Sequence, residues 1–189
     1  MNYFQLIPEL AVGGASAFRL VDNGKARRVM VINIIILGIS FGLSNLIGIL
    51  GRAEIQDLQG RALMLLGLLM ICYGIVTMFV ALFGICLIYW AAAKALGGSG
   101  GLLACLQLIG LAAVPLWFLA PLLNYALRYS PGPGVPPLLL VPLAAAFIWS
   151  FWLLKRSLIF GQGLSDGRAI LAVSGMWIFS VSAIYVFLP

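Results

Sequence analysis

Long apolar runs with charged residues at their boundaries dominate the chain. Five such runs can be traced, at positions 29–50, 62–93, 102–127, 135–154 and 169–188. Each reaches the roughly 20 residues that a helix needs to cross a hydrocarbon core about 30 Å thick. Backbone polar groups inside a bilayer must be paired within their own segment, so these runs are predicted to be helices. The pattern therefore predicts an all-α, polytopic integral membrane protein, a bundle of five transmembrane helices over residues 29–189.

Two of the five runs depart from a simple upright span. The second run has 32 residues, which is longer than a bilayer requires, so its helix should tilt or project beyond the membrane. The third run contains Pro115 and Pro121, and each proline removes a backbone donor and clashes with the preceding turn. We therefore expect the third helix to be kinked.

Composition supports the membrane assignment and bounds the number of domains. Hydrophobic residues make up 63% of the chain and charged residues 8%, with a mean hydropathy of +1.15. Ordinary soluble domains carry about 25% charged residues, and a soluble fold of this size could not hide so much apolar surface. We expect one membrane domain preceded by a cytoplasmic tail, residues 1–28. For this tail, a short interfacial helix and a simple lead-in to the membrane remain open alternatives.

The basic residues predict the orientation of the chain, because cytoplasmic loops carry an excess of Lys and Arg. Eight fall on one predicted side and three on the other, which places the N-terminus inside and the C-terminus outside a bacterial cytoplasmic membrane. The net charge of +6 is assigned to topology and to contact with anionic headgroups at the cytoplasmic face, not to nucleic acid. The eight inner residues are Arg19, Lys25, Arg27, Arg28, Lys94, Lys155, Arg156 and Arg168, and the three outer ones are Arg52, Arg61 and Arg128.

The sequence contains few side chains that could act in catalysis. It has no histidine, and no ionisable Asp, Glu, Lys or Arg lies inside any predicted span. Cys72, Cys86 and Cys105 lie in apolar runs without a Cys-x-x-Cys pair, so their predicted role is packing, although Cys86 and Cys105 could approach each other near the inner side. We therefore predict no catalytic residue, no metal site and no cofactor, and we expect the protein not to be an enzyme.

Small and polar residues within the runs are candidates for contacts between helices. Gly38 and Gly42 form a small-xxx-small pair, which lets two helices approach closely, and packing within the bundle is favoured over dimerisation. Gln107, Asn124 and Tyr125 lie on the third run and could contact a ligand in a cavity beside its kink. Uncharged amide side chains inside a membrane span more often join helices by hydrogen bonds than bind a ligand.

Three short motifs occur in order along the chain. The second run ends in Leu-Gly-Gly-Ser-Gly-Gly at 96–101, whose default interpretation is a flexible cytoplasmic hinge, since it lacks the Lys of a phosphate-binding loop. Gly110 precedes Pro115 by five residues, and the fourth run leaves through a Gly-Leu-Ser turn in which Ser165 is a candidate helix N-cap. In these motifs, over about residues 30–188, the chain resembles the Ypt-interacting protein (Yip) domain family. The positions that carry the resemblance are Gly97, Gly98, Gly101, Gly110, Pro115 and Ser165.

The resemblance implies five spans with a cytosolic N-terminus. Leu111 stands where eukaryotic members carry Tyr, and the long acidic tail with its Asp-Leu-x-Gly-Pro motif is missing. The chain therefore resembles a prokaryotic-type member, and the eukaryotic role in recruiting small GTPases is not carried over to it. The leading hypothesis is a non-enzymatic membrane scaffold or adaptor that packs against membrane proteins or lipids. The alternative is a small transporter or lipid-handling protein with a cavity around the kinked third helix.

Overall fold

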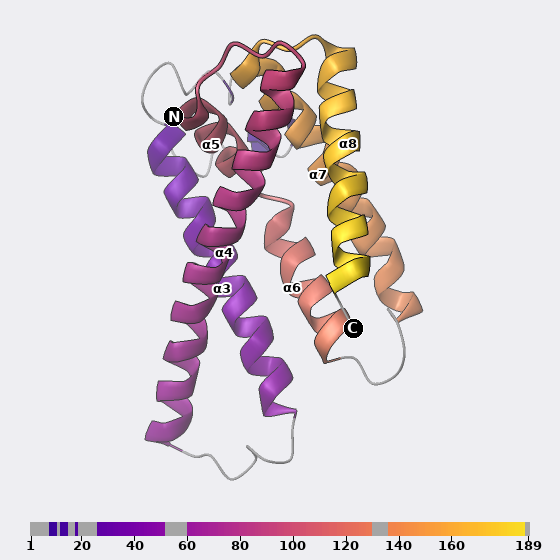
Figure 1. Ribbon diagram of the computed structural model, residues 1–189. Coiled ribbons are helices and arrows are strands. Elements are labelled where there is room, and N and C mark those ends of the chain that lie inside the picture. Colours follow the sequence, from indigo (N-terminus) through magenta and orange to yellow (C-terminus); the bar gives the residue numbers. More distant parts are fainter. Residues whose placement is uncertain are drawn as a thin grey trace. The chain divides into compact units, whose positions relative to one another are not determined.

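The chain is helical throughout the part that is described. The computed structural model describes residues 8–10, 12–14, 18, 26–51, 60–129 and 136–187, with side chains to residue 178, and these residues contain no β-strand. The predicted all-α class is thereby confirmed. Most of the N-terminal tail and of the two loops predicted to lie outside, with Arg19, Lys25 and Arg52, falls outside the described residues. The helices are α3 (Ala26–Leu50), α4 (Arg61–Ala95), α5 (Leu102–Leu111), α6 (Leu116–Arg128), α7 (Pro137–Gln162) and α8 (Asp166–Phe187) (Figure 1).

The number of membrane spans is supported only in part. By length and composition α3, α4 and α7 could each cross a membrane, and α5 with α6 forms a fourth span if the bent pair counts as one. The predicted fifth run lies along α8, which is not among these candidates and whose side chains are described only to residue 178. Five spans therefore remain a prediction.

The third apolar run is broken where its proline predicts a kink. α5 ends at Leu111, residues 112–115 form a turn, and α6 begins at Leu116, with a bend of 76° between the two helices. Pro115 occupies the N-cap of α6 and lacks the N–H that would have bonded back to Leu111. The expected kink is therefore confirmed and is a complete helix break. Pro121, in contrast, lies within α6 and does not end it.

α7 extends further than the apolar run that predicted it. The run was expected to end at residue 154, with Lys155 and Arg156 in the following loop, but the helix continues to Gln162. This loop boundary was wrong because the next two turns still bury an apolar side chain, Leu158, and the charge of Lys155 is paired with Asp166 within the chain.

The helices contribute to two compact units that do not follow helix boundaries. The first unit contains Met1–Met30, Leu82–Ala112 and Phe151–Pro189, and the second contains Val31–Ala81 and Ala113–Ser150. In the first unit the Phe18 and Phe160 rings stack at 5.6 Å, and Phe151 meets Trp177 edge-on at 5.3 Å. In the second unit α6 packs on the first half of α7 through Leu119, Leu143 and Ala146.

In the second unit, α3 and the first part of α4 run side by side and cross at glycines (Figure 1). A Cβ on Gly74 of α4 would collide with the Gly38 carbonyl and with the Gly42 backbone at 2.6 Å from its nitrogen. The backbones therefore meet directly, as small-residue faces allow. Gly38 and Gly42 lie at a contact within the chain, which is the packing role that the sequence favoured over dimerisation.

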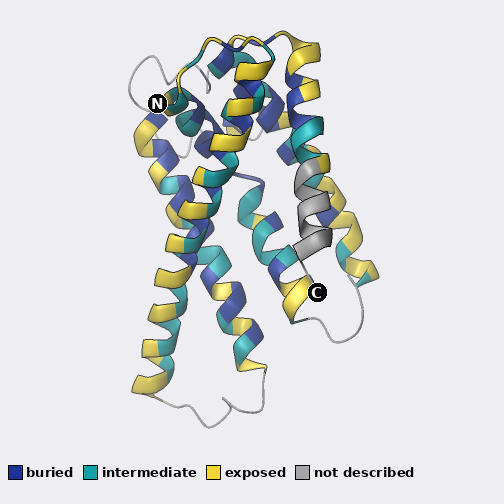
Figure 2. Cartoon of the chain, in the orientation of Figure 1, coloured by how far each residue is buried: buried dark blue, intermediate teal, exposed yellow. Residues whose placement is uncertain are grey.

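Burial differs sharply between the two partners of this crossing. In the most apolar stretch of α4 only 17% of residues are buried, against 50% in α3. Figure 2 shows the exposed residues along α4 from its beginning. They are large and apolar, and include Met64, Leu65, Leu68, Leu69, Tyr73, Val76, Phe79 and Val80.

Candidate functional site

A buried polar cluster joins α6 to α3 in the second unit. The Asn124 amide donates to Ser44 Oγ at 2.8 Å and to Asn45 Oδ1 at 3.0 Å. Tyr129 donates its hydroxyl proton to the same Asn45 oxygen at 3.1 Å. Ser44 and Asn45 in turn donate to the Phe41 carbonyl one helical turn earlier. Every polar side chain in the cluster is thus paired, as an apolar surrounding requires.

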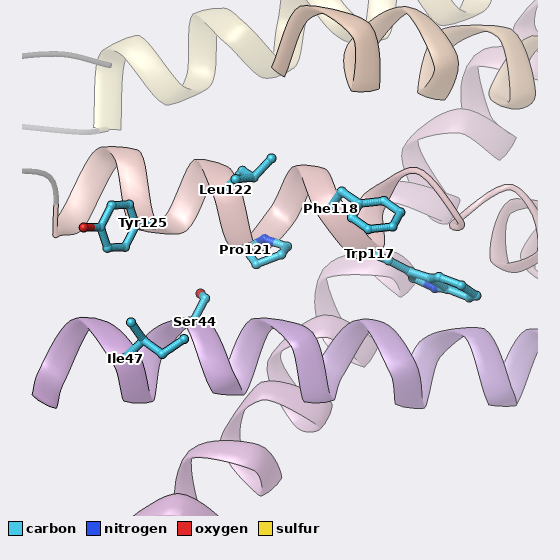
Figure 3. A pocket seen from close by; sticks show the side chains of 7 residues that line it. All are labelled: Ser44, Ile47, Trp117, Phe118, Pro121, Leu122 and Tyr125. Atoms are coloured by element: carbon cyan, nitrogen blue, oxygen red, sulfur yellow. The ribbon is translucent and has the colours of Figure 1, made fainter. Parts of the chain in front are cut away.

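A groove of about 310 Å³ lies beside this cluster, along one side of α6. Its wall from α3 consists of Ser44 and Ile47, and the rest comes from α6 (Figure 3). The Trp117 indole N–H donates to the Asn33 carbonyl at 3.2 Å, which holds that ring in place. The lining from α6 is mainly apolar and consists of Trp117, Phe118, Pro121, Leu122 and Tyr125.

A second hollow of about 410 Å³ shares Ile47 and Tyr125 with the groove and extends toward the end of α6. It is lined in addition by Gly48, Gly51, Arg128 and Tyr129. Gly48 is packed against the Tyr129 ring, because a Cβ there would overlap the ring carbons. Arg128, the last residue of α6, is the one ionised side chain among these lining residues.

The sequence-predicted cavity residues separate into three places. Tyr125 lines both hollows, and Asn124 lies in the polar cluster beside them. Gln107 lies on α5 in the first unit, and it is absent from the lining of either hollow. The residues that sequence reasoning missed are Trp117 and Arg128. No signal in the sequence singled them out, because Trp117 lies in the middle of the third apolar run and Arg128 marks only its boundary.

The Leu-Gly-Gly motif forms a helix cap. Gly97 has a φ of +88°, and its N–H donates to the Lys94 carbonyl, while the Gly98 N–H donates to the Ala93 carbonyl at 2.8 Å. This pair of bonds is the Schellman motif, which ends a helix with a left-handed glycine. Gly97 and Gly98 of the predicted hinge therefore form the C-terminal cap of α4, and a hinge at 97–101 stays a prediction.

The capped loop also packs on the end of α7. The Ser99 N–H donates to the Gln162 carbonyl at 3.0 Å, and a Cβ on Gly100 would overlap the Gly161 carbonyl oxygen. Arg168 of α8 donates to the Leu96 carbonyl at 3.3 Å. Gly101, by contrast, precedes α5 at its N-cap, and a Cβ added there would meet no atom within 4 Å.

The remaining motif residues form local structure as well. Gly110 is buried at the end of α5, where a Cβ would overlap the Met30 side chain. Ser165 directly precedes α8, and its carbonyl accepts the Ala169 N–H at 2.9 Å. It therefore lies at the N-cap position that the sequence predicted for it.

Part of the predicted basic inner surface is neutralised within the chain. The Lys155 ammonium lies 2.8 Å from the Asp166 carboxylate, and it also lies over the Trp152 ring at 4.7 Å from the ring centre. The Arg156 guanidinium lies over the same ring, at 4.9 Å from its centre. Lys155 itself is 9% exposed. Lys155 is therefore less accessible than Arg156, which is half-buried, and Arg168, which is exposed.

The two inner cysteines do meet. Cys86 of α4 and Cys105 of α5 are buried, their thiol groups lie in side-chain contact with each other, and the Cys105 thiol also lies beside the Gln162 side chain. All three residues belong to the first unit. In the described part of the chain, no group of three or more His, Cys, Asp and Glu residues is placed to hold a metal ion. The contact is therefore a pair of thiols in an apolar setting.

Comparison with known proteins identifies the family of the chain. The family model of the Yip1 domain matches residues 13–188, which is nearly the whole sequence. No curated protein and no solved structure matches the chain. The resemblance inferred from the three short motifs is confirmed by this match.

Proposed function

The chain belongs to the Yip1 domain family, and from this premise we propose that it is a non-enzymatic membrane scaffold or adaptor. It acts by packing its helices against other membrane proteins or lipids. The observation that carries the proposal is the exposed apolar surface of α4. Only 17% of the residues in its most apolar stretch are buried within the chain. Large exposed apolar surfaces mark sites of contact with partners or with the membrane.

The glycine crossing supports the choice of this face. Gly38, Gly42 and Gly74 are occupied by the contact between α3 and α4, so the small-residue surface is not open to a partner. The outward side of α4 is lined instead by long side chains such as Leu69 and Val76. A partner helix would therefore dock by interlocking large side chains, with dispersion contacts as the attraction.

Photo-crosslinking in native membranes tests the adaptor function. A photoreactive amino acid at Val76, which is 63% exposed, should capture a defined protein at near-stoichiometric yield. The same group at Met78, on the same helix but 9% exposed, is the matched control and should capture none. Lipid adducts alone at Val76 and at Leu69, with no protein in a mild-detergent purification, would contradict an adaptor for other membrane proteins and leave only packing against lipids.

We further propose a bacterial cytoplasmic membrane as the location, with the N-terminus inside. The support is the eight-to-three distribution of basic residues along the sequence. Arg156 and Arg168 then face anionic headgroups of the inner leaflet, together with Lys94 at the end of α4. A polybasic surface gains about 1 kcal/mol per residue near such lipids.

A second candidate function is favoured by the groove beside α6. A small transporter or lipid-handling protein needs a mainly apolar cavity with a few polar groups, and the apolar groove with the more polar hollow beside it has that character. Purification from native membranes distinguishes the candidates. A specific lipid or small molecule that co-purifies in place of a protein partner would favour this second function.

A further inference from the structure

We infer that the two adjoining hollows of the second unit form one binding site for an anionic phospholipid. Its acyl chain lies in the apolar groove along α6 and its headgroup phosphate lies at Arg128. The inference rests on the second candidate function, and it names the class of ligand and the two ends of the site. The scaffold proposal does not depend on it.

The apolar end of the site fits a hydrocarbon chain. Trp117, Phe118 and Leu122 supply its surface, and Phe118 is 57% exposed, so the groove is open at its side. A ligand can therefore enter sideways from a bilayer. Because the Trp117 indole N–H is already bonded to the Asn33 carbonyl, the ring presents carbon atoms to the ligand.

The polar end of the site fits a phosphate. Arg128 is the one cation in the lining of the second hollow, and no acidic side chain is among the described residues that line it. A guanidinium can bind two phosphate oxygens at once, which gives it an advantage over a neutral donor. Figure 3 shows the Tyr125 hydroxyl directed along α6 toward the end where the helix stops. This hydroxyl offers a second donor between the two hollows.

The apolar groove and the second hollow are continuous, and they follow each other along α6. Ile47 and Tyr125 line both hollows, so no wall of other residues separates the groove from the Arg128 side. The apolar and the cationic portions thus follow each other along α6, as the acyl chain and the phosphate do in a phospholipid.

Native mass spectrometry of the full chain in a neutral detergent tests the site. Phosphatidylglycerol, phosphatidylcholine with the same acyl chains, and oleate are added separately. We expect one phosphatidylglycerol to remain bound under conditions that remove phosphatidylcholine and oleate. Arg128→Gln should weaken phosphatidylglycerol binding about fivefold, the effect of one basic residue at a membrane surface. Arg61→Gln is the matched control, because Arg61 is exposed at the start of α4 and lies outside both hollows.

The outcomes separate this inference from the candidate function beneath it. Equal retention of both phospholipids, or equal loss in Arg61→Gln and Arg128→Gln, overturns the anionic site and leaves lipid handling standing. Retention of oleate alone overturns the phospholipid and assigns a fatty acid. Absence of any retained lipid removes both the inference and lipid handling as the second candidate function, and leaves only a transporter of another small molecule.

Fluorescence quenching supplies an independent measurement at the apolar end. In a variant that keeps Trp117 and replaces Trp90, Trp149, Trp152 and Trp177 with Phe, brominated acyl chains quench only an adjacent indole. Brominated phosphatidylglycerol should quench it at least twofold more than the phosphatidylcholine equivalent in mixed vesicles, and Arg128→Gln should remove the difference. Ile47→Phe, at a site 63% exposed, narrows the groove and should reduce quenching by both lipids. Equal quenching by the two lipids before the Arg128 change contradicts the inference.

Discussion

The Asn124 amide of α6 donates to Ser44 Oγ of α3 across 2.8 Å, although 80 positions separate the two residues in the chain. This hydrogen bond holds α6 against α3 beside the groove. Asn124 is 7% exposed and Ser44 is 8% exposed, so water does not compete for either group. The walls of the groove are therefore positioned by a polar contact within an otherwise apolar interface.

Removing this contact should destabilise the second unit. Asn124→Leu eliminates two hydrogen bonds to α3, and such bonds contribute about 1 kcal/mol in membrane proteins. We expect a loss of about 1 kcal/mol in the free energy of unfolding, measured by SDS titration in mixed micelles. Leu127→Ala, on the same helix but 53% exposed, is the control and should change little. A double-mutant cycle with Ser44→Ala should give a coupling energy clearly above zero; additive effects would show that the two side chains act independently.

Two neighbouring glycines in the capped loop should respond in opposite ways. Gly100→Ala places a methyl group on the Gly161 carbonyl, so the loop or the end of α7 must move. Forced overpacking of this kind costs about 1–3 kcal/mol. Gly101→Ala meets no atom within 4 Å, and its φ of −76° suits alanine, so stability should stay unchanged. Thermal unfolding in detergent compares the two variants. Equal melting temperatures would contradict the close packing of the loop on α7.

Local features of the fold were accessible from sequence because they depend on nearby residues. The break before α6 follows from Pro115 itself, whereas the left-handed glycine cap that ends α4 was not recognised, because the same glycines were interpreted as a hinge. The extent of α7 was missed because the sequence interpretation ended the run at Lys155. Burial of Leu158 extends the helix by two turns, and the partner of Lys155 lies beyond them at Asp166.

Features of the candidate site were less accessible, because they depend on how helices face one another. The sequence identified Asn124 and Gln107 as polar side chains inside the membrane span. Which of them contacts α3 depends on how the helices pack, and the sequence does not give that. Asn124 does, while Gln107 lies in the other unit. The contribution of Arg128 could not be foreseen either. Its side chain reaches a hollow whose remaining wall comes from Gly48 and Gly51, residues of a helix far earlier in the chain.

The crossing of α3 and α4 should tolerate no side chain at its closest point. Gly74→Ala introduces a methyl group that collides with backbone atoms of Gly38 and Gly42, which cannot rotate away. We expect the helices to separate and stability to fall by about 1–3 kcal/mol. Gly84→Ala on the same helix meets nothing within 4 Å and should raise helix stability by about 0.5–1 kcal/mol. SDS titration of both variants measures the difference, and a Gly74→Ala protein as stable as the native chain would rule out this backbone contact.

The orientation of the chain in the membrane is open to a direct labelling test. In a background with Cys72, Cys86 and Cys105 replaced by Ala, single cysteines are introduced as Ser99→Cys and Gly134→Cys. Ser99 is exposed and follows the helix that ends beside Lys94, on the side predicted to face the cytoplasm. An impermeant maleimide should label Gly134→Cys in intact spheroplasts and Ser99→Cys only after lysis. The reverse pattern would place the N-terminus outside, and labelling of both sites before lysis would indicate a mixed population. Either result would remove the basis for assigning Arg156 and Arg168 to the inner leaflet, because the eight-to-three bias would then have failed as a guide to topology.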